Sequence, residues 1–171
     1  MTNFLAIHVE NNLTRQHMTK LDSFNAKILQ TLQSNGRISN IDLAKAVGLS
    51  PSACLRRVQE LERSGTIQGY RAVVNPQSIG KNVVVFVMVG LSGHLKKDAQ
   101  AFEAAMDLAP EVSECHNITG SVEYLLRVEV ADLSQYKAFH SDRLGTLSMV
   151  GTITSHIVLG ASKDRLNIKP R

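Results

Sequence analysis

The stretch "GLSPSACLRRVQELERSG", residues 48–65, contains the signals that decide how the first half of the chain folds. Ser50 can accept hydrogen bonds from the free N–H groups at the start of a helix. Pro51 suits the first helical position, where its missing N–H costs nothing. Gly48 fits the left-handed position that closes a preceding helix, and Gly65 is expected to end the helix that Pro51 opens. The stretch therefore predicts a glycine turn followed by a helix.

Two more helices are predicted upstream of this stretch. Apolar residues after residue 20 recur at helical spacing and form one face, namely Leu21, Phe24, Ile28, Leu29 and Leu32. Ser39 and Asp42 match a capping pattern that opens a second, short helix ending at Gly48. The apolar positions of this second helix are Ile41, Leu43, Ala44 and Val47. Two short helices joined by a glycine turn, with an earlier helix to pack on, predict a helix-turn-helix.

The helix after Pro51 has two different faces when its residues are placed about 100° apart. The residues expected on its core side are Cys54, Leu55, Val58 and Leu61. The residues expected on its exposed side are Ser52, Arg56, Gln59, Glu60 and Arg63, with Arg57 on a flank. Small residues near the N-terminal end would let this helix approach DNA closely. The alternative is an ordinary helical bundle whose charged face is solvated.

The DNA-binding interpretation assigns a role to six residues of this stretch. The candidate DNA contacts are Ser50, Ser52, Ala53, Arg56, Arg57 and Arg63. Base contact is expected for Ser52 and Arg56, while Arg57 is either a phosphate contact or a solvated surface charge. Residues 1–80 contain 9 Lys and Arg against 5 Asp and Glu, whereas residues 81–171 contain 10 of each class. This asymmetry indicates a nucleic acid or another acidic partner for the first half.

The remaining composition argues against several other classes of protein. No apolar run approaches the ~20 residues of a membrane helix, and the N-terminus lacks the features of a signal peptide, so we expect a cytoplasmic protein. Cys54 and Cys115 are too few and too far apart for a disulfide scaffold or a CxxC-type metal site, and both are expected to be buried, reduced thiols. His116 follows Cys115 on a predicted strand and therefore points to the opposite face. We find no set of catalytic residues, and we expect no enzyme activity, cofactor or metal.

The second half predicts the order strand-helix-strand-strand-helix-strand. The strands are expected at "VVVFVMVGL" (83–91), "EVSECHNIT" (111–119), "SVEYLLRVEV" (121–130) and "MVGTITSHIVLG" (149–160), and the helices at 96–109 and "DLSQYKAFHSDRLG" (132–145). Asp132 is the expected cap of the second helix, and Gly120–Ser121 suits a tight hairpin turn. This order is the split-βαβ, ferredoxin-like arrangement, so the whole chain is expected to be of the α+β class.

These signals divide the chain into segments. Residues 1–19 are expected to form an extension, because their apolar residues show no sustained periodicity. Residues 20–76 are expected to form the helix-turn-helix domain. Its last part, "TIQGYRAVV" (66–74), is expected to be extended chain. Residues 77–82 form a linker within the turn-rich connector "NPQSIGKN" (75–82), and residues 83–165 form the βαββαβ domain.

Longer segments resemble a known family. "LDSFNAKILQTLQSNGRISNIDLAKAVGLSPSACLRRVQELERSGTIQGYRAVVNP" (21–76) resembles the N-terminal domain of the Lrp/AsnC family, the feast/famine transcriptional regulators. "ECHNITGSVEYLLRVEVADLSQY" (114–136) resembles the central hairpin and second helix of the family's effector-sensing domain. The resemblance runs from about Leu21 to about Lys169.

The resemblance implies a sequence-specific regulator that binds double-stranded DNA through a winged-type helix-turn-helix domain. An extended linker strand would lead to a βαββαβ domain that forms a homodimer, and dimers would assemble further, often into octamers. A small effector, usually an amino acid, would bind at contacts between dimers and alter assembly or DNA affinity.

The candidate effector-binding residues are Thr119, Gly120, Ser121 and Glu123. Glu123 could bind the ammonium group of an amino acid, and the two hydroxyls and the hairpin backbone could bind its carboxylate. The family's Gly-x-x-Asp-Tyr/Phe motif reads Gly120-Ser121-Val122-Glu123-Tyr124 here, with glutamate one methylene longer than aspartate. The alternative to an effector site is a tight turn of purely structural importance with a glutamate on the surface.

Two other functions compete with this interpretation. Sirohaem decarboxylases look similar over both domains, but the basic helix face and the absence of a convincing histidine cluster argue against such an enzyme here. An architectural protein that compacts DNA with little sequence preference is the third possibility.

Overall fold

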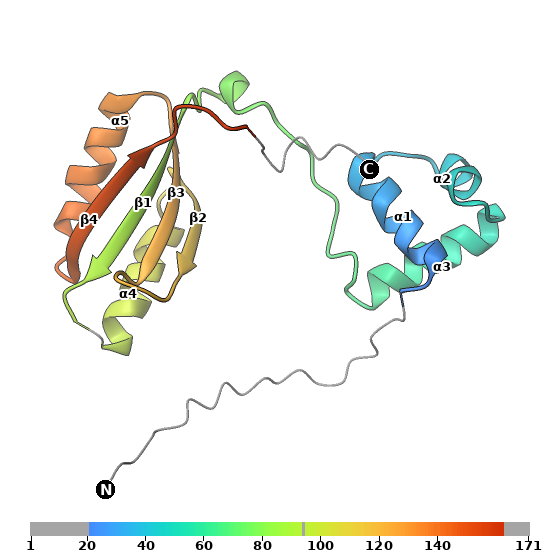
Figure 1. The fold of residues 1–171 in the computed structure, drawn as a ribbon, viewed down its shortest axis with the longest axis horizontal. Helices are drawn as coiled ribbons and strands as arrows, with labels where there is room; N and C mark the ends of the chain where they lie inside the picture. Colours follow the sequence, from blue (N-terminus) through green and yellow to red (C-terminus); the bar gives the residue numbers. More distant parts are fainter. Residues whose placement is uncertain (1–20, 94, 163–171) are drawn as a thin grey trace, which may run out of the picture. The chain divides into compact units, whose positions relative to one another are not determined.

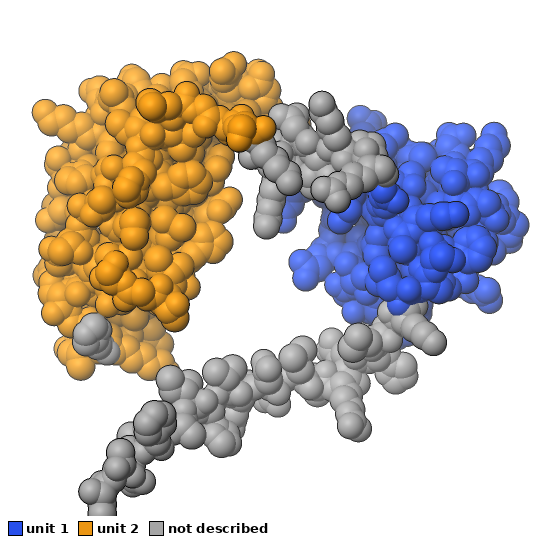
Figure 2. All heavy atoms as spheres, in the orientation of Figure 1, with its two compact units in different colours: residues 1–72, 165–171 blue, residues 73–164 orange. Residues whose placement is uncertain are grey.

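The computed structural model describes residues 21–93 and 95–162, which form two compact units, with the boundary along the chain between Ala72 and Val73 (Figure 1, Figure 2). The expected extension over residues 1–19 lies outside the described residues, as does the predicted end of the second domain at residue 165. Within the described ranges, no helix is long and apolar enough to cross a membrane.

The first unit contains the helices α1 (Ser23–Ser34), α2 (Asn40–Val47) and α3 (Pro51–Arg63) (Figure 1). Helices as short as these depend on capping and packing, because a short isolated helix is only marginally stable in water. The connection between α2 and α3 is the predicted glycine turn. The order and bounds of the helices confirm the helix-turn-helix prediction.

Local hydrogen bonds explain where each helix begins. The side chains of Asp22, Ser39 and Ser50 accept hydrogen bonds from the backbone N–H three residues further on, at 2.8, 3.1 and 3.3 Å. Gly48 closes α2 in the left-handed conformation, with φ 76°, which a glycine adopts without a Cβ clash. The caps at Ser39 and Ser50 confirm the starts that the sequence predicted for α2 and α3.

The core of the first unit brings all three helices together. Its buried members are Ile28, Leu43, Ala44, Val47, Cys54 and Leu61. Four residues at predicted apolar positions are instead exposed, namely Leu21, Phe24, Ile41 and Leu55. Leu55 is 46% exposed because it lies about 100° around α3 from Cys54, and Ile41 is 57% exposed because it lies on nearly the opposite side of α2 from Leu43. The prediction that Cys54 belongs to the core is confirmed.

The segment after α3 differs from an ordinary strand. Residues 66–75 contain no strand among the described residues, although Ile67 packs against the helical core. Tyr70 donates a hydrogen bond from its hydroxyl to Glu62 at 2.9 Å, so the segment returns along the end of α3. The connector that follows contains a short 3₁₀ helix, Pro76–Ile79.

The second unit is the predicted βαββαβ arrangement. Its elements are β1 (Val83–Leu91), α4 (Lys96–Asp107), β2 (Val112–Asn117), β3 (Tyr124–Val130), α5 (Leu133–Ala138) and β4 (Val150–Ile157). The strands form an antiparallel sheet in the order β2-β3-β1-β4, so β1 and β3 are central and β2 and β4 are edges. β1 is apolar along its whole length, although only one of its two faces is fully buried in this chain.

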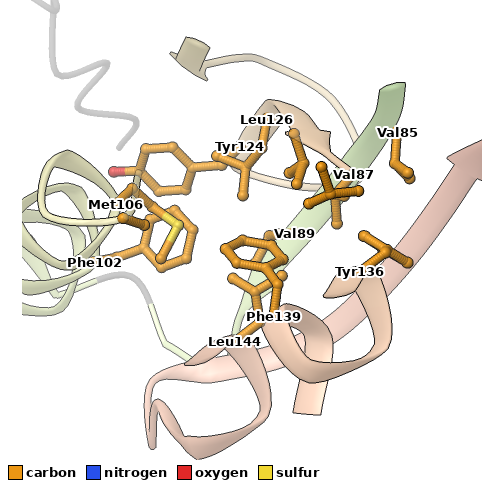
Figure 3. Packing of buried hydrophobic residues seen from close by; sticks show 13 residues of the cluster. Val85, Val87, Val89, Phe102, Met106, Tyr124, Leu126, Tyr136, Phe139 and Leu144 are labelled. Carbon is orange, nitrogen blue, oxygen red and sulfur yellow. The ribbon is translucent and has the colours of Figure 1, made fainter. Parts of the chain in front are cut away.

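The core of the second unit lies between one face of this sheet and the two helices (Figure 3). Val85, Val87 and Val89 of β1 are fully buried there. Phe102 of α4 contacts Tyr124 of β3, with ring centroids 4.6 Å apart. Aromatic pairs at this separation add stabilisation beyond the area that they bury.

After Ala138, at the end of α5, the chain does not continue as a regular α-helix. Phe139–Arg143 forms a π-helical turn, and Leu144–Thr146 forms a short 3₁₀ helix. The N–H of Leu144 donates to the carbonyls of His140 and Phe139, four and five residues earlier. The wider turn accompanies burial of both Phe139 and Leu144 in the core (Figure 3).

Two predictions for the hairpin region are wrong. The connection between β2 and β3 spans residues 118–123 and is closed by a bond from the Ile118 N–H to the Glu123 carbonyl at 2.8 Å, so it is not a two-residue turn. Gly120, with φ +136°, lies within this wider loop. Cys115 is exposed instead of buried, because β2 is an edge strand with little covering it.

Candidate DNA-binding and effector-binding sites

The N-terminal half of α3 presents an exposed polar surface opposite the core. Ser50 caps the helix, and its hydroxyl lies 3.3 Å from the hydroxyl of Ser52. Arg56 is exposed and forms no ion pair with any residue that the structure describes. Ala53, which lies between Ser52 and Arg56 in the sequence, is half-buried. The hydroxyls of Ser50 and Ser52 at the start of the helix, together with the nearby Arg56 guanidinium, are suited to contact phosphates and base edges.

Arg63, at the other end of α3, is held by a neighbour on the same helix. Its Nε and Nη2 donate to the two carboxylate oxygens of Glu60 at 2.9 and 2.7 Å. Both side chains are well exposed, so the pair can exchange with solvent and contributes little to stability. A phosphate near Arg63 would have to compete with this carboxylate.

Arg57 is directed away from this exposed surface. Its Nη1 lies 2.7 Å from Oδ2 of Asp22, and it also donates to Oδ1 of Asn25 at 2.9 Å. The six candidate DNA residues are therefore not equivalent: Arg56 is open to solvent, whereas Arg57 is bound to α1. The sequence placed Arg57 on a flank but could not identify its partners.

A polar contact that the sequence did not reveal joins α2 to α3. The side-chain amide of Asn40 donates to the carbonyl of Pro51 at 2.9 Å. This bond holds the first residue of α3 against the start of α2. Asn40 follows the capping residue Ser39 directly, but no local pattern indicates a partner eleven residues away.

The four candidate effector residues lie at the β2–β3 hairpin, and Glu123 is distinct among them. Thr119, Gly120 and Ser121 are exposed in the loop. Glu123 is half-buried at its base, where its carboxylate Oε2 accepts a hydrogen bond from the N–H of Leu91 at 2.8 Å. The structure thus gives Glu123 a role at the end of β1, next to an irregularity in the β1–β4 register.

A cavity of about 380 Å³ lies elsewhere in the second unit, between α4 and β2. Its lining residues are Glu103, Met106, Asp107, Val112, Ser113, Glu114, Cys115, Asn117 and Tyr124. The Tyr124 hydroxyl donates to Glu103 at 2.8 Å, and burial, followed by this carboxylate, raises the pKa of Tyr124. Desolvation, and then Glu103, also raises the pKa of the Cys115 thiol, although the residue as a whole is exposed. None of the predicted site residues lines this cavity.

The histidine on β2 has a carboxylate neighbour. His116 Nε2 lies 2.9 Å from a carboxylate oxygen of Glu114, and both side chains are exposed. Across the described parts of the chain, no group of three or more His, Cys, Asp and Glu side chains is arranged to hold a metal ion.

Comparison with known protein families identifies both units. A family model described as the Lrp/AsnC ligand binding domain matches residues 84–168, and one described as a winged helix-turn-helix DNA-binding domain matches residues 21–68. The leucine-responsive regulatory protein of Escherichia coli K12 is 40% identical over 153 residues, covering 88% of this chain and 93% of the relative. That of Haemophilus influenzae is 41% identical over 144 residues, covering 84% and 87%.

Solved structures give the same result. A Neisseria meningitidis transcriptional regulator in complex with L-methionine is 36% identical, with a TM-score of 0.81, covering 84% of this chain and 93% of that one. A feast or famine regulatory protein from M. tuberculosis complexed with L-methionine is 29% identical, with a TM-score of 0.72, covering 84% and 95%.

Proposed function

The chain belongs to the Lrp/AsnC family of DNA-binding transcriptional regulators, and on that premise we propose which of its residues read DNA and which sense the effector. The single observation that carries the DNA-binding part is the exposed Arg56, which lies on α3 opposite the core without an ion-pair partner among the described residues. An arginine of this kind can form two hydrogen bonds to a guanine edge.

In this proposal, α3 is the helix that enters the major groove. Ser52 and Arg56 contact base edges, because they lie on the solvent side of the first turns of the helix. Ser50, Ala53 and the N–H groups at the helix start lie close to a phosphate. Arg63 contacts the backbone when its bond to Glu60 is exchanged for a phosphate.

The test is operator binding by the Arg56→Ala variant. We expect it to lose about 1–3 kcal/mol of discrimination between the operator and unrelated DNA, as for the loss of one bidentate base contact. Lys27→Ala is the matched control, since it removes one exposed positive charge from α1. Unchanged operator affinity of a folded Arg56→Ala variant at moderate salt would contradict the assignment.

For the effector, we propose an amino acid that binds at the β2–β3 hairpin through Thr119, Gly120, Ser121 and Glu123. The exposed hydroxyls and backbone of the loop supply donors for a carboxylate, and Glu123 supplies the negative charge for an ammonium group. The names of the relatives, which mention leucine and methionine, support the class of ligand.

A thermal-shift screen of the twenty amino acids tests this proposal. A ligand at about 100 times its dissociation constant should stabilise the native state by about 2.7 kcal/mol. Glu123→Gln should weaken binding of the selected amino acid while keeping an oxygen that can accept the Leu91 N–H. Glu114→Gln on exposed β2 is the control. Undiminished binding by Glu123→Gln would remove this residue from the site.

We also propose that the chain forms a homodimer through the open sheet face, defined by Val84, Phe86, Met88, Leu125 and Arg127. These residues alternate with the buried core residues of β1 and β3 and are only half-buried in one chain. A second copy would cover them and would pair two recognition helices, after which dimers would assemble further, up to octamers. Phe86→Lys should shift the sedimenting species towards the monomer, and an unchanged dimer would exclude this face.

A further inference from the structure

Arg57 follows Arg56 directly on α3 but is on a different side of the helix. Because successive residues are about 100° apart, Arg57 lies only about 60° from the fully buried Cys54. Its side chain is 29% exposed. The guanidinium therefore lies at the edge of the helical core, whereas Arg56 faces the solvent.

The partners of Arg57 all belong to the start of α1. Its Nη1 donates to Asp22 Oδ2 at 2.7 Å and to Asn25 Oδ1 at 2.9 Å, and its guanidinium carbon lies 5.4 Å from the centre of the Phe24 ring. Contact with two oxygen acceptors and one aromatic ring defines the direction of the side chain, which a single exposed ion pair would not do.

The acceptors are themselves held in place. Asp22 caps α1 through its other oxygen, which accepts the N–H of Asn25 at 2.8 Å. That backbone bond, followed by the bond from Arg57, lowers the pKa of the Asp22 carboxyl. Asn25 is 6% exposed, and a buried amide oxygen without a partner would be costly. The start of α1 thus presents two hydrogen-bond acceptors in fixed positions to the Arg57 guanidinium.

We propose that Arg57 is a positioning residue for DNA recognition: it sets the rotation of α3 about its own axis and thereby aims Arg56 and Ser52. This inference rests on the proposed function. The buried contacts of Cys54 and Leu61 hold α3 in the core, but apolar contacts are not directional. A rotation of about 15° would move a group about 6 Å from the helix axis by roughly 1.6 Å. A binding group needs to be held within about 0.5 Å of its productive position.

The competing role is a direct phosphate contact by Arg57, and the two roles predict opposite effects of Asp22→Asn. If Arg57 binds phosphate, removal of the Asp22 charge frees the guanidinium and removes repulsion, so DNA binds more tightly. If Arg57 positions α3, the same substitution weakens binding to the operator. Asparagine is as good a helix cap as aspartate, so α1 keeps its start.

The experiment uses the full chain and the duplex that the wild type selects from a random-sequence pool. Dissociation constants are measured across a salt series for Asp22→Asn, Arg57→Gln and the double variant, on this duplex and on unrelated DNA. Asp42→Asn is the matched control, because it removes an exposed acid from another helix start. Thermal unfolding confirms that each variant is folded at the assay temperature.

We expect each single variant to bind the selected duplex about tenfold more weakly, which corresponds to about 1.4 kcal/mol. The double variant should lose no more than one single variant, because both remove the same link. Unrelated DNA should be bound within about twofold of the wild type, and the salt dependence of Asp22→Asn should be unchanged.

Two results would overturn the positioning role. One is unchanged or tighter binding by Asp22→Asn. The other is an equal loss of affinity for both duplexes by Arg57→Gln, with a salt slope reduced by about one, as for the loss of a phosphate contact. A wild type that selects no duplex, or an Arg56→Ala variant that binds normally, would instead contradict the proposed function.

Discussion

The Gly90→Ala substitution tests how closely the end of β1 packs against its neighbours. A Cβ added at Gly90 would lie 2.4 Å from Oγ1 of Thr152 on β4, 3.6 Å from Val122 and 3.7 Å from the Glu123 carboxylate. Gly90 is not among the glycines with positive φ, so its backbone would accept alanine. Any destabilisation must therefore come from the contact with its neighbours and not from backbone strain.

The size of the effect follows from the shortest of these distances. A separation of 2.4 Å between a methyl carbon and a hydroxyl oxygen requires Thr152 or the strand to move. Such overpacking costs about 1–3 kcal/mol. In a domain of roughly 60–100 residues, each kcal/mol lowers the melting temperature by about 4–8 °C. We expect the variant to melt roughly 5–20 °C below the wild type.

The assay is a double-mutant cycle with Thr152→Ala, which removes the clashing oxygen. Unfolding can be followed by tyrosine fluorescence, since Tyr124 and Tyr136 both lie in the second unit. Gly90→Ala should cost at least about 0.5 kcal/mol less in the Thr152→Ala background than in the wild type. An unchanged melting temperature, or the same cost in both backgrounds, would refute the steric reasoning.

Two further predictions concern ionisable groups. Because the folded-state pKa of Asp22 is lowered from 3.8, its contribution to stability is complete above about pH 4 and is lost as the pH falls through the lower, folded value. When the free energy of unfolding is measured in urea at a series of acid pH values, it should therefore fall less steeply with decreasing pH in Asp22→Asn than in the wild type. An equal pH dependence in the two proteins would contradict this. The raised pKa of Cys115 predicts slower iodoacetamide labelling at neutral pH than for a free thiol, with Cys54 labelled only on unfolding. Peptide mass mapping that finds Cys54 modified first would contradict this order.

Helix termini were predictable because their signals are local. Ser39 and Ser50 each bond to an N–H three residues away, and Gly48 adopts its conformation from its own missing Cβ. The strands were similarly readable, since β1 is a continuous apolar run and β3 alternates buried and half-buried residues along its own sequence. No distant residue needs to be known to interpret these features.

Two errors show where local reasoning failed. Leu55 was assigned to the core from its apolar nature and its angle on the helix, but it is 46% exposed, because a core position also requires a partner from another element. The hairpin was predicted as a two-residue turn from Gly120 and Ser121 alone. Its actual width accompanies the bond between Glu123 and Leu91, which are 32 residues apart.

By itself, the sequence determined the order of the helices and strands, their caps and the basic face of α3, because each depends on residues within a few positions of one another. The helical period also placed Arg56 on the exposed side and Arg57 on a flank, but only the tertiary structure identified the partners of Arg57. These partners are Asp22 and Asn25, which are 35 and 32 residues away from Arg57 in the chain. Folding brings these acceptors beside Arg57, and no helical period could identify them.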